Sequence, residues 1–240
     1  MYERRTYRDL IKAGGLISFG VSVKETDLWI CADRLLENEA KEHVFQIRGH
    51  IESYIKSHPL FLKTLVPWVV DGPAPLIVRE MAQAGIRAGV GPMAAVAGAI
   101  AESVGVGLLT YSNEIIVENG GDIFIQLDRP FTYSIFAGKS PLSMRFGIRL
   151  DYTGAPFAVC TSSATIGHSF SAGKADAVCV VSNSCAVADA AATSICNQVT
   201  SEKEIQRSIN FGKRIDGVSV IVVIVGEKIG IWGNAEIVPL

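Results

Sequence analysis

At 240 residues, the chain is long enough for one large domain or two small ones, and it can bury a substantial core. Hydrophobic residues make up 49% of it and charged residues 19%, a balance that indicates a compact globule and excludes a disordered chain. The formal net charge of -2 lacks the basic excess typical of nucleic-acid-binding proteins, so we expect no nucleic-acid partner.

Apolar segments and the N-terminus argue against a membrane or exported protein. The strongly apolar run Val218–Val225 is interrupted by Ser219 and is far shorter than the ~20 residues that span a bilayer as a helix. The stretch Gly89–Leu109 is longer, but it consists largely of Gly and Ala and contains Glu102, which indicates a buried helix. The charged segment Met1–Asp9 lacks the apolar core of a signal peptide, and the five cysteines contain no CxxC pair. We therefore expect a cytoplasmic protein with free thiols and no membrane contact.

In chain order, the N-terminal part predicts a hairpin followed by helices. Leu16–Val23 and Leu28–Ala32 are rich in β-forming residues and flank a polar turn. Apolar residues then recur at helical spacing, and prolines stand where helices stop or start. Helices are expected over Leu35–Ser57, Pro75–Ala88 and Pro92–Val104.

The C-terminal part predicts a run of strands and two further helices. Strands are expected over Glu114–Glu118, Asp122–Leu127, Thr132–Phe136, Met144–Leu150, Pro156–Thr161 and Ala177–Val181. An Ala-rich helix is expected over Cys185–Asn197, and the capping box Ser201–Glu204 predicts the start of a helix that reaches about Lys213. Gly217–Val225 and Lys228–Trp232 predict a closing hairpin.

The order of these elements indicates the fold class. Strands cluster in meanders and helices arrive in groups, which favours an α+β fold over a doubly wound sheet. No proline- or serine-rich linker divides the chain. We therefore expect one domain over 1–240, and a division into sub-lobes at 1–88 and 89–240 stays open.

Two glycine-rich segments are candidate ligand sites. Gly89–Gly91 precedes a predicted helix, whose first N–H groups and dipole would favour an anion such as phosphate. The alternative at Gly91 is a tight turn with close helix packing. Asn119-Gly120-Gly121-Asp122 lies between two predicted strands, and its glycines permit positive φ and the close approach of a ligand. The alternative there is an ordinary hairpin turn.

Hydroxyl side chains and one imidazole follow a predicted strand. Thr161, Ser162 and Ser163 could hydrogen-bond to a phosphate or to a ring carbonyl. His168 lies a few residues further on and could act as an acid or base near neutral pH. A structural histidine is the alternative.

A carboxylate and a hydroxyl are spaced one turn apart on the Ala-rich helix. Asp189 and Thr193 lie four residues apart, so they share one helix face, and every residue between them is alanine. Such a pair of hard oxygen donors could hold Mg²⁺. The alternative is local: Asp189 caps or forms an ion pair, and Thr193 bonds back to its own helix.

The order of these motifs from Gly89 to Asn197 resembles that of the ApbE family, Mg²⁺-dependent enzymes that use FAD to attach FMN to a Thr or Ser of a target protein. The resemblance implies that Asp189 and Thr193 bind the metal and that Asn119, Gly120, Gly121 and Asp122 form the family's glycine-rich turn. It also implies that Thr161, Ser162 and Ser163 match the family's Thr-Ser-Gly stretch, with Ser163 in place of the glycine, and that His168 is the family's histidine. Here Ser169–Lys174 stands in place of the family's Asp-Pro-x-Thr-Gly stretch.

Nearly the whole chain is also similar to an ApbE-like family found in archaea and some bacteria. Val23–Leu28, Gly91–Gly98 and Gly167–Ser169 are typical of it. The resemblance implies an ApbE-like, T-fold-related fold with mixed, mainly antiparallel sheets packed with helices. Members have been linked to sulfur incorporation during homocysteine formation.

Three functions stay open at this point. The chain is a Mg²⁺-dependent enzyme that acts on FAD or another nucleotide, a component of sulfur incorporation, or a binding protein that kept the fold without the chemistry. The expected partners are a flavin or other small molecule, a protein partner and a second copy of the chain in a homodimer.

Overall fold

The computed structural model describes residues 14–151, 154–164 and 173–240, and its centre is a large antiparallel sheet. In the described residues, eight strands pair in the order β1-β2-β3-β4-β7-β8-β9-β10, and every neighbouring pair is antiparallel. The strands are β1 (Ile17–Val23), β2 (Thr26–Ala32), β3 (Ile115–Asn119), β4 (Asp122–Gln126), β7 (Phe157–Ser162), β8 (Ala177–Ser182), β9 (Val218–Val225) and β10 (Lys228–Gly233). Strand order thus follows chain order, except that β5 and β6 leave the sheet.

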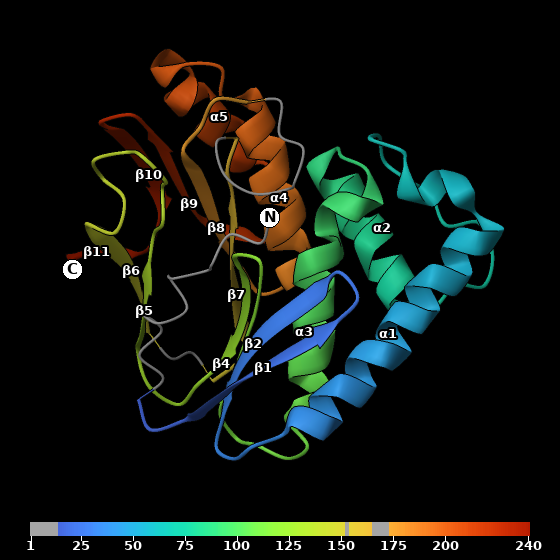
Figure 1. Ribbon diagram of the computed structural model, residues 1–240. Helices are drawn as coiled ribbons and strands as arrows, with labels where there is room; N and C mark the ends of the chain where they lie inside the picture. The colour runs from blue at the N-terminus through green and yellow to red at the C-terminus, as the bar shows by residue number, and fades with distance from the viewer. Residues whose placement is uncertain (1–13, 152–153, 165–172) are drawn as a thin grey trace.

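A second, three-stranded sheet packs on one face of the first. It consists of β5 (Phe131–Ser134), β6 (Phe146–Leu150) and β11 (Glu236–Pro239), in the order β11-β6-β5. Figure 1 shows these strands on one side of the large sheet and the helices on the other. One apolar cluster, which includes Ile125, Phe131, Ile148 and Val222, fills the space between the two sheets.

The other face of the large sheet is covered by helices. The described part of the chain contains α1 (Glu37–Ser57), α2 (Leu76–Ala88), α3 (Val96–Leu108), α4 (Cys185–Gln198) and α5 (Ile205–Gly212), with 3₁₀ turns η2 (Pro59–Leu62), η3 (Pro92–Ala95) and η4 (Glu202–Glu204). The larger apolar cluster lies between this layer and the sheet. Because β8 is covered on both faces, its residues read Ala-Val-Cys-Val-Val-Ser without polar alternation, and all six are buried.

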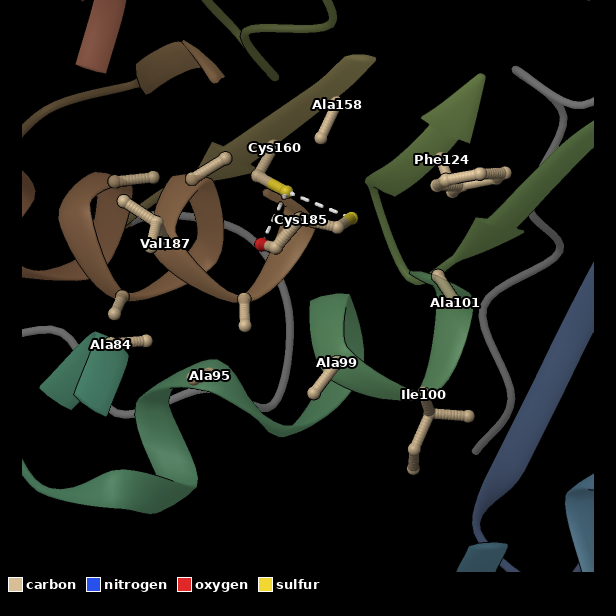
Figure 2. Packing of buried hydrophobic residues seen from close by; sticks show 14 of the residues in the cluster. Ala84, Ala95, Ala99, Ile100, Ala101, Phe124, Ala158, Cys160, Cys185 and Val187 are labelled. Atoms are coloured by element: carbon tan, nitrogen blue, oxygen red, sulfur yellow. Dashed lines mark hydrogen bonds between the residues drawn. The ribbon is translucent and has the colours of Figure 1, made fainter. Parts of the chain in front are cut away.

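The two helices at the centre of the layer are thin. α3 is built mostly of Ala, Gly and Val, and α4 contains five alanines; Figure 2 shows Ala101 of α3 beside the strand that carries Phe124. Small side chains let the helix backbones approach each other and the sheet closely. This close approach determines the geometry of the site described below.

The fold class expected from the sequence is confirmed: mainly antiparallel sheets are packed with helices. Several local expectations were wrong. The Ser201 side chain makes no capping hydrogen bond, and η4 precedes the helix, so the capping box does not form. The helix expected from Pro92 begins as η3 and becomes α-helical only at Val96. The strand β11 was missed because it is a short edge strand that ends in Pro239.

Within the described residues, no single helix has the length and apolar composition to cross a membrane. Leu76–Ala88 and Pro92–Leu108 pass that test only when taken together, and they are bent by 104° at their junction.

Candidate functional site

The candidate site lies at one end of the large sheet. The β3–β4 turn and the end of β7 meet there, because Asn119 pairs with Asp122 and Asp122 pairs with Cys160. These three residues project from the same face of the sheet, toward α3 and α4: the Asn119 Nδ2 donates to the Ala97 carbonyl (3.0 Å), and the Cys160 thiol donates to the Cys185 carbonyl (3.5 Å).

Two carboxyl groups face each other at this place. Asp122, at the start of β4, is 7% exposed, and Asp189, from the second turn of α4, is half-buried. Burial raises the pKa of Asp122 well above its usual range, and the nearby charge of Asp189 raises it further, while the Cys160 thiol and the Thr161 amide lower it by hydrogen bonding. Burial also raises the pKa of Asp189, to about 7, although hydrogen bonds from the Gly98 and Ala97 amides lower it.

Within the residues described, neither carboxyl group has a cationic partner. Among the residues that the structure describes, no Lys, Arg or His forms an ion pair with Asp122 or Asp189. Two buried carboxylates at one place repel each other unless a proton or a cation intervenes. The pair is therefore suited to a divalent metal ion, whose preferred ligands are oxygens.

The start of α3 closes the site on the helix side. The Asp189 Oδ2 accepts a hydrogen bond from the Gly98 amide at 2.9 Å. A Cβ atom on Gly98 would overlap the Cys185 carbonyl oxygen and would lie 2.9 Å from the Asp189 Cβ. Only glycine at this position lets α3 approach α4 closely enough for Asp189 to reach the first amides of α3.

The β3–β4 turn is a two-residue turn that needs both of its glycines. Gly120 and Gly121 have φ of 68° and 107°, a region that residues with a Cβ rarely adopt. The Gly121 amide donates to the Oε1 of Glu118 at 2.9 Å, and Glu118 is fully buried. Gly120 is exposed at the tip of the turn, whereas Asp122, which follows it, is buried.

The hydroxyl residues at the end of β7 divide between the two faces of the sheet. The Thr161 side chain lies on the face opposite Asp122, where its Oγ1 lies 2.9 Å from the Tyr133 hydroxyl of β5. Ser162 pairs with Val178 and lies on the helix side, where it is buried. Ser163 follows the strand and is half-buried. Because side chains alternate along a strand, the Thr161 hydroxyl points to the face that carries the three-stranded sheet. Its backbone amide donates a hydrogen bond to Asp122.

Three sequence-predicted residues do not join this group by any described contact. Gly91 is buried, and a Cβ there would overlap the Thr64 carbonyl oxygen, so close backbone packing alone accounts for this glycine. Thr193 lies one turn beyond Asp189 on α4 and is half-buried. His168 lies outside the described residues. In the described ranges, no group of three or more His, Cys, Asp or Glu side chains has the arrangement of a metal site.

Glu102 is a residue that the sequence motifs did not single out. Its Oε2 accepts hydrogen bonds at the start of α4, from the Cys185 amide (2.8 Å) and the Ser184 hydroxyl (3.2 Å). The position of a carboxylate inside an otherwise Gly/Ala-rich apolar helix was the signal in the sequence for such a contact. The sequence alone does not say which group the carboxylate contacts.

The cysteines near the site are buried thiols. The Sγ atoms of Cys160 and Cys185 lie 3.6 Å apart, as Figure 2 shows, and both residues are fully buried. Burial raises the pKa of Cys185 to about 11 and that of Cys179 to about 12, and it also raises the pKa of Cys160 well above its usual value. All five cysteines are buried and form no disulfide. Burial disfavours the thiolate forms of Cys160, Cys179 and Cys185 near neutral pH.

Comparison with protein families identifies the chain. The model of the family described as "AbpE bacteria" matches residues 8–216. The chain belongs to this family. The resemblance to ApbE-like proteins seen in the sequence is thereby confirmed.

Close relatives occur in methanogenic archaea. A UPF0280 protein of Methanocaldococcus jannaschii is 41% identical over 220 residues, which cover 89% of this chain and 89% of the relative. A UPF0280 protein of Methanosarcina barkeri is 42% identical over 215 residues, 88% of this chain and 85% of the relative.

Solved structures of ApbE proteins share the fold of this ApbE-like chain. The apo flavinyl transferase ApbE of Pseudomonas stutzeri superposes with a TM-score of 0.61 at 14% identity, covering 90% of this chain and 93% of that chain. A mutant of the flavin transferase ApbE from Vibrio cholerae superposes with a TM-score of 0.59 at 12% identity. The match covers 90% of this chain and 96% of the Vibrio chain. At these identities the similarity establishes the architecture.

Proposed function

We propose that this chain is a Mg²⁺-dependent enzyme that acts on FAD or another nucleotide in the cytoplasm. The observation that carries the proposal is the juxtaposition of the Asp122 and Asp189 carboxyl groups beside the Gly120–Gly121 turn. Carboxylates without a neighbouring cationic side chain suit a metal ion that would in turn hold a phosphate.

Each group at the site has an assigned part. Asp189 and Thr193 would hold the ion, and Asp122 would add a second carboxylate beside it. A bound Mg²⁺ supplies positive charge that stabilises the phosphate oxygens during bond cleavage. The amide of Gly98 and the amide of Thr161 fix the two carboxylates in place. His168 remains our proposed acid or base.

Flavin is the ligand that the comparisons favour. Two of the solved structures with this fold carry the names flavinyl transferase and flavin transferase. A protein acceptor for the transferred group is part of the same proposal. The buried, high-pKa thiols lend no support to thiol chemistry in sulfur incorporation.

The proposal is tested by FAD binding with and without Mg²⁺. Isothermal titration of the purified chain with FAD is expected to show binding that requires Mg²⁺. Asp189→Asn and Asp122→Asn are each expected to weaken it about tenfold or more, since tenfold corresponds to about 1.4 kcal/mol, a modest loss for a carboxylate beside a metal.

The matched control is Asp216→Asn, because the Asp216 side chain is 86% exposed and makes one long ion pair with Arg87. This variant is expected to bind like the wild type. Binding of FAD that is equally tight in EDTA, or that survives both site substitutions, would contradict a metal-dependent site.

A further inference from the structure

Helices α3 and α4 each place a carboxylate at the N-terminus of the other. The Glu102 carboxylate of α3 accepts hydrogen bonds from the Cys185 and Ala186 amides, at 2.8 and 3.4 Å, and from the Ser184 hydroxyl. The Asp189 carboxylate of α4 accepts a hydrogen bond from the Gly98 amide. The first amides of a helix have no partner within the helix, so each carboxylate satisfies donors that would otherwise be unpaired.

The two halves of this arrangement have the same spacing. Glu102 follows Gly98 by four residues, and Asp189 follows Cys185 by four residues. In each helix, therefore, the amide that donates and the carboxylate that accepts lie one turn apart on the same face. The helices meet at Gly98, where the absent Cβ admits the Cys185 carbonyl.

Electrostatics strengthens both contacts. A carboxylate at a helix N-terminus interacts favourably with the peptide dipoles, and hydrogen bonds to a charged acceptor are stronger than neutral ones. Within the described residues Glu102 forms no ion pair, and its charge raises the pKa of the Glu80 carboxyl of α2, which burial raises first. The α4 amides are therefore the groups that stabilise the Glu102 charge.

We propose that Glu102 is a positioning residue for Asp189. This inference rests on the proposed function, because it matters for activity only if Asp189 holds the ion. Glu102 anchors the first turn of α4, and Asp189 projects from the next turn. Without Glu102, the amides of Cys185 and Ala186 lose their acceptor, the start of α4 shifts, and Asp189 loses its alignment with the Gly98 amide and with Asp122.

A second consequence concerns the ligand. The N-terminus of α4 is occupied by Glu102 and that of α3 by Asp189. A phosphate group of the ligand would therefore be held through the metal ion and not by these helix N-termini.

The test compares Glu102→Ala and Glu102→Gln with Ser208→Ala. Ser208 is fully buried in α5, and its hydroxyl donates to the Ile205 carbonyl at 2.8 Å, so its loss removes a hydrogen bond within α5 and none between α3 and α4. Glu102→Gln keeps one acceptor oxygen and the side-chain length, which protects the experiment if Glu102→Ala fails to fold.

The first measurement needs no ligand. Amide hydrogen exchange, followed by NMR, is expected to show faster exchange at Gly98 and Cys185 in both Glu102 variants, with the larger effect in Glu102→Ala, and no change in Ser208→Ala. Because the Gly98 amide donates to Asp189 and not to the Glu102 side chain, faster exchange there reports a displaced Asp189. Wild-type protection at Gly98 in Glu102→Ala would overturn the proposal.

The second measurement is the FAD titration with Mg²⁺. Both Glu102 variants are expected to bind about tenfold more weakly, while Ser208→Ala binds like the wild type despite its lower melting temperature. Unchanged affinity in the Glu102 variants would overturn the positioning role. A wild-type protein that binds no FAD refutes the proposed function instead, and the exchange at Gly98 then decides whether Glu102 places Asp189.

Discussion

Two carboxyl groups, Asp122 and Asp189, distinguish the site from the apolar surroundings of α3 and α4. Both have raised pKa values for the same primary reason, because burial disfavours a charged carboxylate. Asp122 is further affected by the charge of Asp189. Near neutral pH the metal-free Asp189 therefore keeps part of a proton that an unfolded chain would release.

This difference predicts a pH dependence of stability. The pKa of Asp189 rises from 3.8 in its ordinary state to about 7 in the folded protein. A raised folded-state pKa stabilises the fold fully below the unfolded pKa, and that stabilisation is lost as the pH rises through about 7. We expect the free energy of unfolding of the metal-free protein, measured with urea in EDTA, to fall as the pH rises from about 4 to about 7.

Substitution of Asp189 separates the contribution of this carboxyl pair to the pH dependence of stability from the contribution of the other titrating groups. Asp189→Asn removes one titrating group and the charge that raises the pKa of Asp122, so the slope of stability against pH should become smaller. The exposed Asp216→Asn variant should keep the wild-type slope. Equal slopes in all three proteins would show that the pair does not titrate as described.

The thiols give a second prediction at the same scale. All five cysteines are buried, and burial raises the pKa of Cys31, Cys160, Cys179 and Cys185. We expect dithiobis(nitrobenzoate) to modify none of them rapidly in the native protein at about pH 8, because the reagent needs an accessible thiolate. All five should react in urea. One fast-reacting cysteine in the native state would reopen thiol chemistry as a function.

Among the secondary-structure elements, the contact between α3 and α4 depends on one glycine. An alanine at Gly98 would meet the Cys185 carbonyl and the Asp189 side chain, so the helices must separate. We expect Gly98→Ala to lower the free energy of unfolding by about 2 kcal/mol or more, as overpacking does, and to weaken FAD binding as well.

Gly49 provides the matched control in α1. It is also a helical glycine, but it is exposed and a Cβ there meets nothing within 4 Å. Gly49→Ala is expected to raise stability by roughly 0.5–1 kcal/mol, because alanine has the higher helix propensity. Urea unfolding of both variants checks the pair, and changes of the same sign would contradict the packing argument.

At the scale of the whole molecule, the N-terminal and C-terminal parts share one sheet and one core. β2 pairs with β3, and the cluster beneath the helices contains Leu28 and Met81 together with Ile195 and Ile221. A fragment of residues 89–240 would expose the edge of β3 and half of this cluster. We therefore expect the sub-lobes considered from the sequence not to fold separately.

The chain should accordingly unfold in a single transition. Its tryptophans report different places: Trp29 lies in β2, Trp68 between α1 and α2, and Trp232 in β10. Tryptophan fluorescence and far-UV circular dichroism are expected to give coincident urea curves, as two-state unfolding requires. Two separated transitions, or a stably folded 89–240 fragment, would establish independent lobes.

Local features of the chain were predictable because their causes are local. Helical spacing, β-forming runs and the Gly120–Gly121 turn depend on neighbouring residues, and they led to the α+β class and to nearly every element. The same logic failed where a distant contact decided the outcome: the edge strand β11 pairs with β6, and Ser201 makes no cap.

The composition of the site could be anticipated only in part. The motifs pointed to Asn119, Asp122 and Asp189, and the fold brings these three to one end of the sheet. The motifs did not show that the Thr161 hydroxyl lies on the opposite face, that Gly91 packs under Thr64, or that Glu102 anchors α4. Sequence patterns encode periodicity and turns, whereas burial, raised pKa values and reciprocal helix contacts arise only when segments far apart in the chain pack together.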